Sequence, residues 1–438
     1  MTFLARTIRE SVPLLAIVIS SLLMMPCAAW SAERLELQPL IEEALQHNRE
    51  ILAMESRVAA SKYRTSQAQS LPDPMFMFGY QNEGLSTYNY GDSPDAKWMF
   101  EVSQMFPFAG KRGLRGKMAA ADAESLRSFY EAQRLKVIAR VTELFYDLFQ
   151  VHKNLEVLGV RAEILSKIEE AALARYSAGM ASQQDVIMAQ AEKYMLLEKE
   201  EMLRQKIPSL EAMLSLSLGR ESYMPLGVPA PPPVTMKYES GPDELIKQAY
   251  DSSPEVKAKQ NMLASAETKV SMAKREYFPD VTLNAGVETR GGEFGDMYRA
   301  TSTINIPLYF KTKQEPAVRE AEAGLQESKH ELEATKLIIA SAIRENYAMI
   351  KSAERLMDLY RNSLIPKANQ SFDASLSQYT AGKAEAGSVI ARLKALLDFD
   401  LAYWGQYADR QKAVARVEAL VGAAEAAPDV PSTQVRPK

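Results

Sequence analysis

Few side chains in this 438-residue sequence could carry metal or acid–base chemistry. The three histidines, His47, His152 and His330, fall on different expected helices, each without a second histidine or a cysteine at ligand spacing. A zinc site needs several such ligands together, so we expect no metal site and no cofactor. The sequence also has no Gly-Lys-Ser/Thr phosphate loop and no recognisable nucleophile motif. We therefore expect no catalytic residues and no enzyme.

Methionine is the other candidate ligand, because the sequence has 21 of these residues. Thioethers bind soft metals, so a copper or silver site is one interpretation. Most of the methionines, however, are scattered over expected helices, where methionine commonly fills irregular gaps in a core. We favour the filling role.

Composition argues against one class of partner, and the amino-terminal residues predict export from the cytoplasm. The formal net charge is −4 without a basic run, so no nucleic acid partner is expected. Arg6, Arg9, an apolar run over 12–25 and small residues after it predict a signal peptide over 1–32. Cleavage would follow Ala29 or lie a residue or two later. Cys27 would be removed with it or lipidated, and Met25-Pro26 disfavours lipidation.

A repeated turn organises the sequence. Tyr-Ser/Thr-Ala-Gly occurs within 175–187 and again within 378–390, each time followed by Val-Ile and helix formers. Glycine tolerates the positive φ that ends a helix, so each copy predicts a tight turn between antiparallel helices. Leu40–Ala53 and Leu245–Ala258 match at nearly the same offset. We predict two equivalent halves, 33–224 and 241–422, joined by a Pro-rich linker over 225–240, with a disordered tail over 423–438.

Each half contains two segments that alternate between apolar and polar residues, predicting β-hairpins at about 75–106 and 280–308. Strands of about ten residues with an apolar face and aromatic residues are typical of outer-membrane barrels. Soluble hairpins packed on helices are the alternative. Four strands cannot close a barrel in lipid, so three copies would supply twelve. The expected lipid-facing residues are Phe76, Phe78, Trp98, Phe100, Leu283, Val287, Ile304 and Ile306.

Long helical segments surround the hairpins. A helix is expected over about 36–70. Long helices follow over about 112–218, with one helix over 112–177 returning as another over 182–218. In the second half they occupy about 316–422, where Pro366 is expected to kink or break the chain. The fold class is therefore mainly α with a membrane β-barrel portion and two structural repeats.

This order of elements resembles the TolC-type outer membrane factor family over nearly the whole sequence. Phe106–Arg115 and Ile306–Pro316 resemble the strand-to-helix junctions of its heavy-metal RND efflux branch. The resemblance implies a homotrimer with a twelve-stranded barrel in outer-membrane lipid and a long periplasmic α-helical tunnel. It also implies a periplasmic membrane fusion (adaptor) protein and an inner-membrane RND-type pump as partners.

The resemblance also assigns roles to the turns. Tyr176, Gly179, Tyr379 and Gly382 match the family's periplasmic tip, where the adaptor docks, although these residues could simply end helices. Some members carry an acidic ring near the second tip. Here Ser388 stands where a carboxylate is expected, Asp185 occupies the equivalent place in the first half, and Glu385 is the nearest acid in the second. These three are the candidate gate or ion-contacting residues. A single acid on a helix surface is usually just solvated, which is the alternative.

The predicted function is a passive outer-membrane exit duct of a tripartite efflux system, with heavy-metal cations as the preferred substrate. Drug efflux and type I secretion are alternatives within the family. A periplasmic coiled-coil structural protein without transport activity is the alternative from another class.

Overall fold

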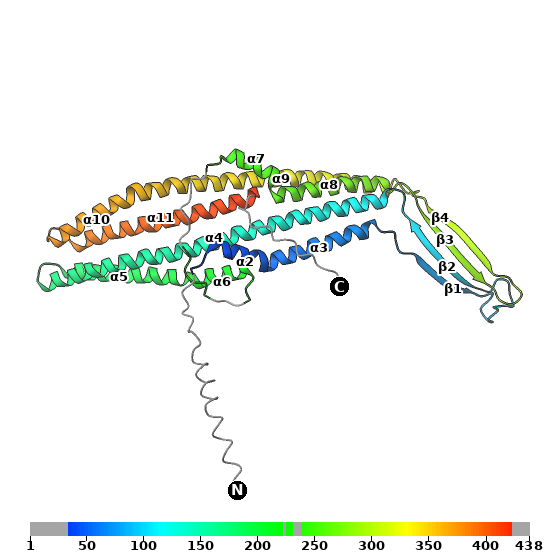
Figure 1. Cartoon of the computed structure of the whole chain (residues 1–438), viewed down its shortest axis with the longest axis horizontal. Coiled ribbons are helices and arrows are strands. Elements are labelled where there is room, and N and C mark those ends of the chain that lie inside the picture. Colours follow the sequence, from blue (N-terminus) through cyan, green and yellow to red (C-terminus); the bar gives the residue numbers. More distant parts are fainter. Residues whose placement is uncertain (1–33, 222–224, 231–238, 423–438) are drawn as a thin grey trace, which may run out of the picture.

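The computed structural model describes residues 34–221, 225–230 and 239–422. The expected signal peptide with Cys27, part of the linker and the tail lie outside the described residues. The chain is elongated, with a β-sheet at one end and two helical turns at the opposite end (Figure 1). Most of the described residues are helical.

The sheet contains four antiparallel strands in the order β1-β2-β3-β4. The first half of the chain contributes β1 and β2, and the second half contributes β3 and β4. Because the order is sequential and open, β1 and β4 are edge strands. The bounds are β1 Met75–Gln81, β2 Lys97–Phe106, β3 Asp280–Thr289 and β4 Met297–Asn305.

Helices form the rest of the rod. Helix α4 has 67 residues and spans about 100 Å at 1.5 Å per residue. The first half contains α2 Leu37–His47, α3 Arg49–Gln69, α4 Lys111–Ser177, α5 Gln183–Arg204 and α6 Lys206–Leu218. The second half contains α7 Pro242–Ser252, α8 Pro254–Arg275, α9 Gln314–Leu359, the π-helix η1 Tyr360–Leu364, α10 Ile365–Thr380 and α11 Ala386–Val421.

The single helix expected over 36–70 is wrong, because Asn48 divides it into α2 and α3. Asn48 has extended backbone angles, and its side chain accepts hydrogen bonds from the backbone N–H groups of Glu50 and Ile51. Asparagine is among the best helix caps for this reason. Its side-chain amide also donates to the carbonyl of Ser217 at 2.8 Å, which ties this break to α6.

Two prolines explain other interruptions. The returning helix expected over 182–218 is two helices, α5 and α6, separated at Gln205. Pro208 lacks the N–H that would bond to the carbonyl of Arg204, so the regular ladder cannot continue there. The disturbance expected at Pro366 is the π-helical turn η1 just before it, which re-routes the backbone hydrogen bonds without ending the helix.

Packing follows the long axis in three hydrophobic clusters. One surrounds Phe145 and Phe149 in the middle of the rod, and another surrounds Ile343 and Ile350. The third packs the two helix pairs against each other near the helical turns and includes Leu165 of α4 and Leu393 of α11. Each cluster takes residues from both halves of the chain or from helices far apart in sequence. The two halves therefore share a core.

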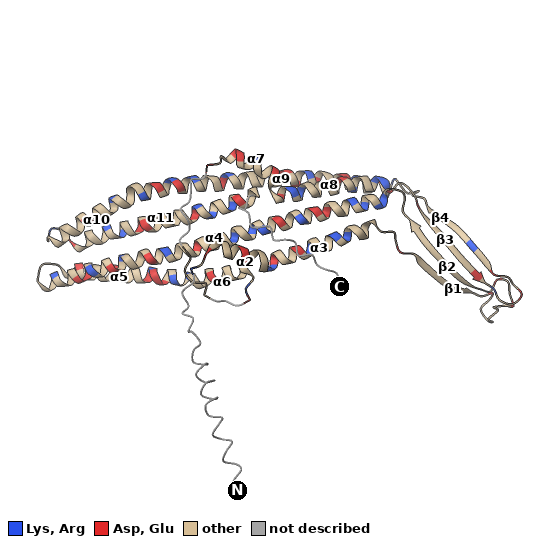
Figure 2. Ribbon diagram, viewed as in Figure 1, with Lys and Arg blue, Asp and Glu red and all other residues tan. Residues whose placement is uncertain are grey.

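Charge is distributed unevenly along the rod. Lysine, arginine and acidic residues are spread over the helices and are sparse on the strands (Figure 2). Within residues 34–221, 225–230 and 239–422, no helix combines the length and apolarity needed to cross a membrane.

Candidate functional site

The register of the sheet places the predicted lipid-facing strand residues on one side. Phe78 pairs with Phe100, which pairs with Val287, and alternation along each strand puts the others on the same side. We call this the apolar face; its members include Phe76, Phe78, Tyr80, Trp98, Phe100, Val102, Leu283, Val287 and Ile304. β4 ends at Asn305, so Ile306 lies one residue beyond the strand, where 63% of its surface is exposed.

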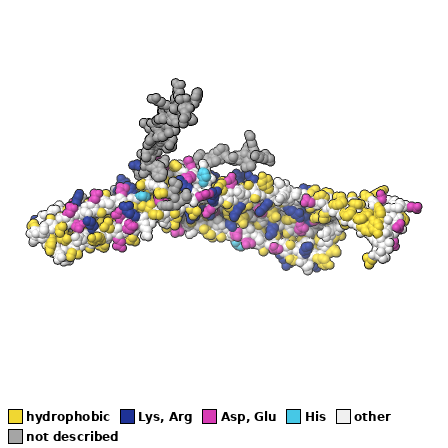
Figure 3. All heavy atoms as spheres, turned by 90° about the horizontal axis from the view of Figure 1, so that it is seen from below, with side chains coloured by type: hydrophobic (Ala, Val, Ile, Leu, Met, Phe, Trp, Pro, Cys, Tyr) yellow, Lys and Arg dark blue, Asp and Glu magenta, His cyan; other side chains and the backbone are white. Residues whose placement is uncertain are grey.

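Aromatic rings dominate the apolar face in the first half. Trp98 stacks on Phe78 with centroids 5.1 Å apart and lies 4.7 Å from the ring of Tyr80. Phe76 nevertheless remains 67% exposed in the single chain. Hydrophobic side chains gather at this end of the molecular surface (Figure 3). Such a large exposed apolar surface indicates a site of contact with lipid or another protein.

The opposite side, which we call the polar face, has a different chemistry. Asn284 donates from its side-chain amide to the hydroxyls of Thr301 and Thr303, both at 3.2 Å. Glu288 is buried between two cations: its carboxylate accepts from Lys97 at 2.8 Å and pairs with Arg299. The sheet thus separates an apolar from a hydrophilic surface.

A buried lysine fixes the sheet to the helices. The Lys111 ammonium is almost fully buried and donates to Asp280 at 2.9 Å, to Glu276 at 3.1 Å and to the carbonyl of Phe278 at 3.0 Å. All three of its donors are therefore used. Lys111 begins α4 in the first half, whereas its partners belong to the second half. This contact was missed by sequence reasoning, because nothing local pairs residues so far apart.

The two helical tips share one turn geometry. Gly179 and Gly382 have φ of 68° and 76°, the left-handed region that other residues adopt at a cost. The N–H after each glycine donates back to the residue before the tyrosine: Met180 to the Arg175 carbonyl at 2.8 Å, and Lys383 to the Gln378 carbonyl at 2.9 Å. This pattern closes a helix end with its carbonyls satisfied.

The two tip tyrosines, however, have different surroundings. Tyr176 is 44% exposed, whereas Tyr379 is 1% exposed. The Arg175 guanidinium lies 4.6 Å from the centre of the Tyr379 ring and donates to the Tyr379 carbonyl oxygen. Burial raises the pKa of Tyr379; Arg175 opposes the shift and Asp185 adds to it. The buried hydroxyl of Tyr379 has no hydrogen-bond partner among the described residues.

Two of the three candidate gate residues, Glu385 and Ser388, contact each other, and Asp185 lies on the other helical turn. Asp185 lies in the first turn of α5, is mostly buried, and its N–H donates to the cap residue Ser182. Glu385 precedes α11 and is exposed, and the Ser388 hydroxyl donates to its carbonyl at 2.9 Å. In the described part of the chain, no hydrogen bond or ion pair joins Asp185 to either residue.

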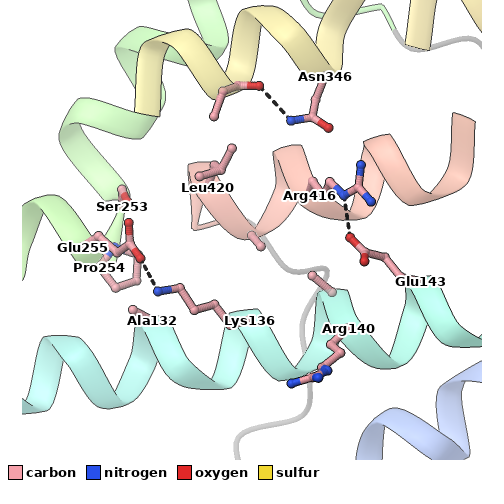
Figure 4. Close-up of a pocket in the computed structure, with 13 residues that line it drawn as sticks. Ala132, Lys136, Arg140, Glu143, Ser253, Pro254, Glu255, Asn346, Arg416 and Leu420 are labelled. Carbon is pink, nitrogen blue, oxygen red and sulfur yellow. Dashed lines mark hydrogen bonds and ion pairs between the residues drawn. The ribbon is translucent and has the colours of Figure 1, made fainter. Parts of the chain in front are cut away.

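A pocket of about 370 Å³ lies between α4, α8, α9 and α11 (Figure 4). Two ion pairs hold its walls: Lys136 with Glu255 at 2.6 Å, and Arg416 with Glu143 at 2.6 Å. Much of the remaining lining is alanine, leucine and proline. These charges pair with each other, so the pocket offers no obvious nucleophile or acid–base pair. No group of three or more His, Cys, Asp or Glu suited to a metal occurs among the described residues.

Comparison with known proteins gives the geometry a context. The model of the family described as outer membrane efflux protein matches residues 40–220 and 245–423. The cobalt-zinc-cadmium resistance protein CzcC of Cupriavidus metallidurans is 22% identical over 326 residues, 72% of this chain and 74% of that protein. The pyoverdine export outer membrane protein OpmQ of Pseudomonas aeruginosa is 21% identical and covers 88% of this chain and 84% of its own.

The fold leads to the same result. The outer membrane protein VceC of Vibrio cholerae superimposes with a TM-score of 0.75 at 18% identity, covering 88% of this chain and 96% of that one. The two chains therefore share their fold. The chain belongs to the outer membrane efflux protein family, a family of channels located in the outer membrane. The predicted resemblance and fold class are confirmed.

Proposed function

We propose that this protein is the passive outer-membrane exit duct of a tripartite efflux system, and that its preferred substrates are heavy-metal cations. The observation that carries the proposal is the open sheet, with two faces of opposite polarity and two unpaired edge strands, β1 and β4. In lipid, unpaired backbone groups cost several kcal/mol each, so the edges must be covered. Three copies joined edge to edge would form a twelve-stranded barrel.

The faces of that barrel follow from the same physics. The apolar face with Phe76, Leu283 and Ile304 would contact lipid, and the polar face with Asn284 and Thr303 would line the lumen. The helices would continue the lumen as a periplasmic tunnel. Tyr176, Gly179, Tyr379 and Gly382 lie at its far end, where an adaptor protein would dock and connect the duct to an inner-membrane RND-type pump.

The metal preference rests on the similarity to the cobalt-zinc-cadmium resistance protein CzcC, and pyoverdine export by OpmQ is the competing precedent. Deleting the protein should raise the cellular content of Co²⁺, Zn²⁺, Cu⁺ or Ag⁺ during exposure, measured by elemental analysis of washed cells. Unchanged contents of all four cations would contradict metal export. Purification should yield a detergent-requiring trimer that conducts ions in planar bilayers, whereas a monomer released by osmotic shock would contradict the duct itself.

A further inference from the structure

The methionines of the sheet are distributed unequally between its two faces. All the methionines in the four strands lie on the polar face: Met75, Met77, Met99, Met105 and Met297. The apolar face, where a gap-filling hydrophobic residue would be useful, has none. Filling gaps in a hydrophobic core is a common use of methionine. It does not explain five methionines among threonine, asparagine and charged side chains.

Three of these methionines form a row along β1. Met75 and Met77 point to the same side of the strand, because side chains alternate. Met99 on β2 pairs with Gly79, and its terminal methyl lies 3.4 Å from where a glycine Cβ would be. The thioether side chain of Met99 therefore lies over Gly79, next in line after Met77. Met75 and Met77 are 63% and 48% exposed, so ligands can reach them.

The remaining two methionines extend the row. Met105 is the diagonal neighbour of Met75 across the first hairpin, at a distance that long side chains can bridge. Met297 lies on β4, the opposite edge strand, and is 45% exposed. In the proposed barrel, β4 of one copy pairs with β1 of the next copy. Met297 would then lie beside the methionine row of that next copy.

The chemistry of this face favours soft cations. Thioether sulfur binds Cu(I) and similar soft d¹⁰ ions and has little affinity for hard ions. Of the strand carboxylates on this face that could serve a harder ion, Glu288 is already held by Lys97 and Arg299, whereas Glu101 lies opposite Met77, within the methionine row. We propose that the polar face carries a methionine track that binds soft monovalent cations, Cu(I) or Ag(I), weakly and successively as they leave. This inference rests on the proposed exit-duct function and narrows its substrate class.

Weak, repeated sites suit a conduit. An ion must bind well enough to enter and loosely enough to leave, and adjacent equivalent sites achieve both. A row of exposed thioethers without an enclosing cage meets this requirement. A closed site with four strong ligands would retain the ion instead.

The test uses the full-length protein purified from outer membranes, with Ag(I) as the probe in chloride-free buffer and Zn(II) for comparison. The triple variant Met75→Leu/Met77→Leu/Met99→Leu keeps the side-chain volume and removes the sulfur atoms. We expect its Ag(I) affinity, measured by equilibrium dialysis, to fall by more than about tenfold, as expected when ligands are lost. Zn(II) binding should not change.

The matched control is Met202→Leu/Met213→Leu/Met349→Leu, which removes three exposed methionines from the helices. Its Ag(I) affinity should equal that of the unmodified protein. Equal losses in both triple variants, or full Ag(I) binding by the strand variant, would overturn the methionine track. Failure of the exit-duct proposal gives a different result: cells with and without the protein would then accumulate the same amount of silver, whatever the purified protein binds.

Discussion

The two halves of the chain build the same helical tip from different neighbours, and the difference shows how a repeat becomes asymmetric. Both turns have a left-handed glycine and the same closing hydrogen bond. Tyr176 nevertheless faces solvent, whereas Tyr379 is buried under Arg175. The residue equivalent to Arg175 in the second half is Gln378, which cannot return the interaction. The two tyrosines thus have different surroundings although their turns match.

The hairpins differ in composition but not in the division of their faces. The first hairpin has stacked aromatic rings on its apolar face and methionines on the other. The second has Leu283 and Val287 on the apolar face and hydrogen-bonded Thr301 and Asn284 on the polar face. Membrane insertion needs only the difference in polarity, so the halves could diverge in every other respect.

The strongest test of the tip comparison replaces each tyrosine with alanine. Tyr379→Ala should lower the free energy of unfolding by about 3–5 kcal/mol, because a buried ring leaves a cavity. Tyr176→Ala should change it by less than about 0.5 kcal/mol, the usual result for an exposed residue. Urea denaturation of each purified variant measures both values. Equal changes in the free energy of unfolding for the two variants would contradict the difference in burial between the two tyrosines.

The face division is tested next, in both hairpins. Phe78→Arg and Leu283→Arg should each cost about 2–4 kcal/mol near the centre of the bilayer and reduce the amount of assembled protein. Glu101→Arg and Thr282→Arg, on the polar face, should assemble normally. Heat-modifiable mobility of membrane extracts on gels reports assembly. Similar losses on both faces would mean that the sheet is not oriented as proposed.

Arg175→Gln makes the first tip resemble the second at one position. We expect a loss of about 1–2 kcal/mol in the free energy of unfolding, since a desolvated cation–π contact and a charge-assisted hydrogen bond disappear together. Gln378→Arg is the reciprocal control and should not restore the stability in the double variant. If the double variant regains the stability of the unmodified protein, an arginine in either tip stabilises the pair of tips equally.

The smallest expected effect concerns the unpartnered hydroxyl of Tyr379. Its pKa in the folded protein lies above the usual value near 10, mainly because of burial. The folded protein thus holds this proton more tightly than the unfolded chain, so stability is complete below about pH 10 and falls as the pH rises above it. Tyr379→Phe should reduce this decline and cost little at pH 7. Unfolding curves of Tyr379→Phe and of the unmodified protein at pH 8 and pH 10.5 measure the decline in stability of each. An equal decline in the two proteins would contradict the prediction.

Sequence reasoning predicted the elements that have strong local signals. Alternation over 280–305 predicted two strands, and glycines at 179 and 382 predicted two tight turns, because both signals depend on backbone geometry within a few residues. It was wrong where a single residue had to be weighed against a long helical pattern. Asn48 caps a new helix and Pro208 interrupts the returning one. At Ile306 the alternation continued although the strand had ended.

The sequence alone was enough for the family, the two-faced strands and the paired turns, since periodicity and turn chemistry are local and occur twice. The tertiary structure alone decided which equivalent residue is buried and which long-range contacts form. Lys111 finds its carboxylates, and Arg175 covers Tyr379, only because the two halves pack side by side. Such contacts join residues more than 160 positions apart. No local pattern encodes them, because their energy depends on the burial that the whole fold creates.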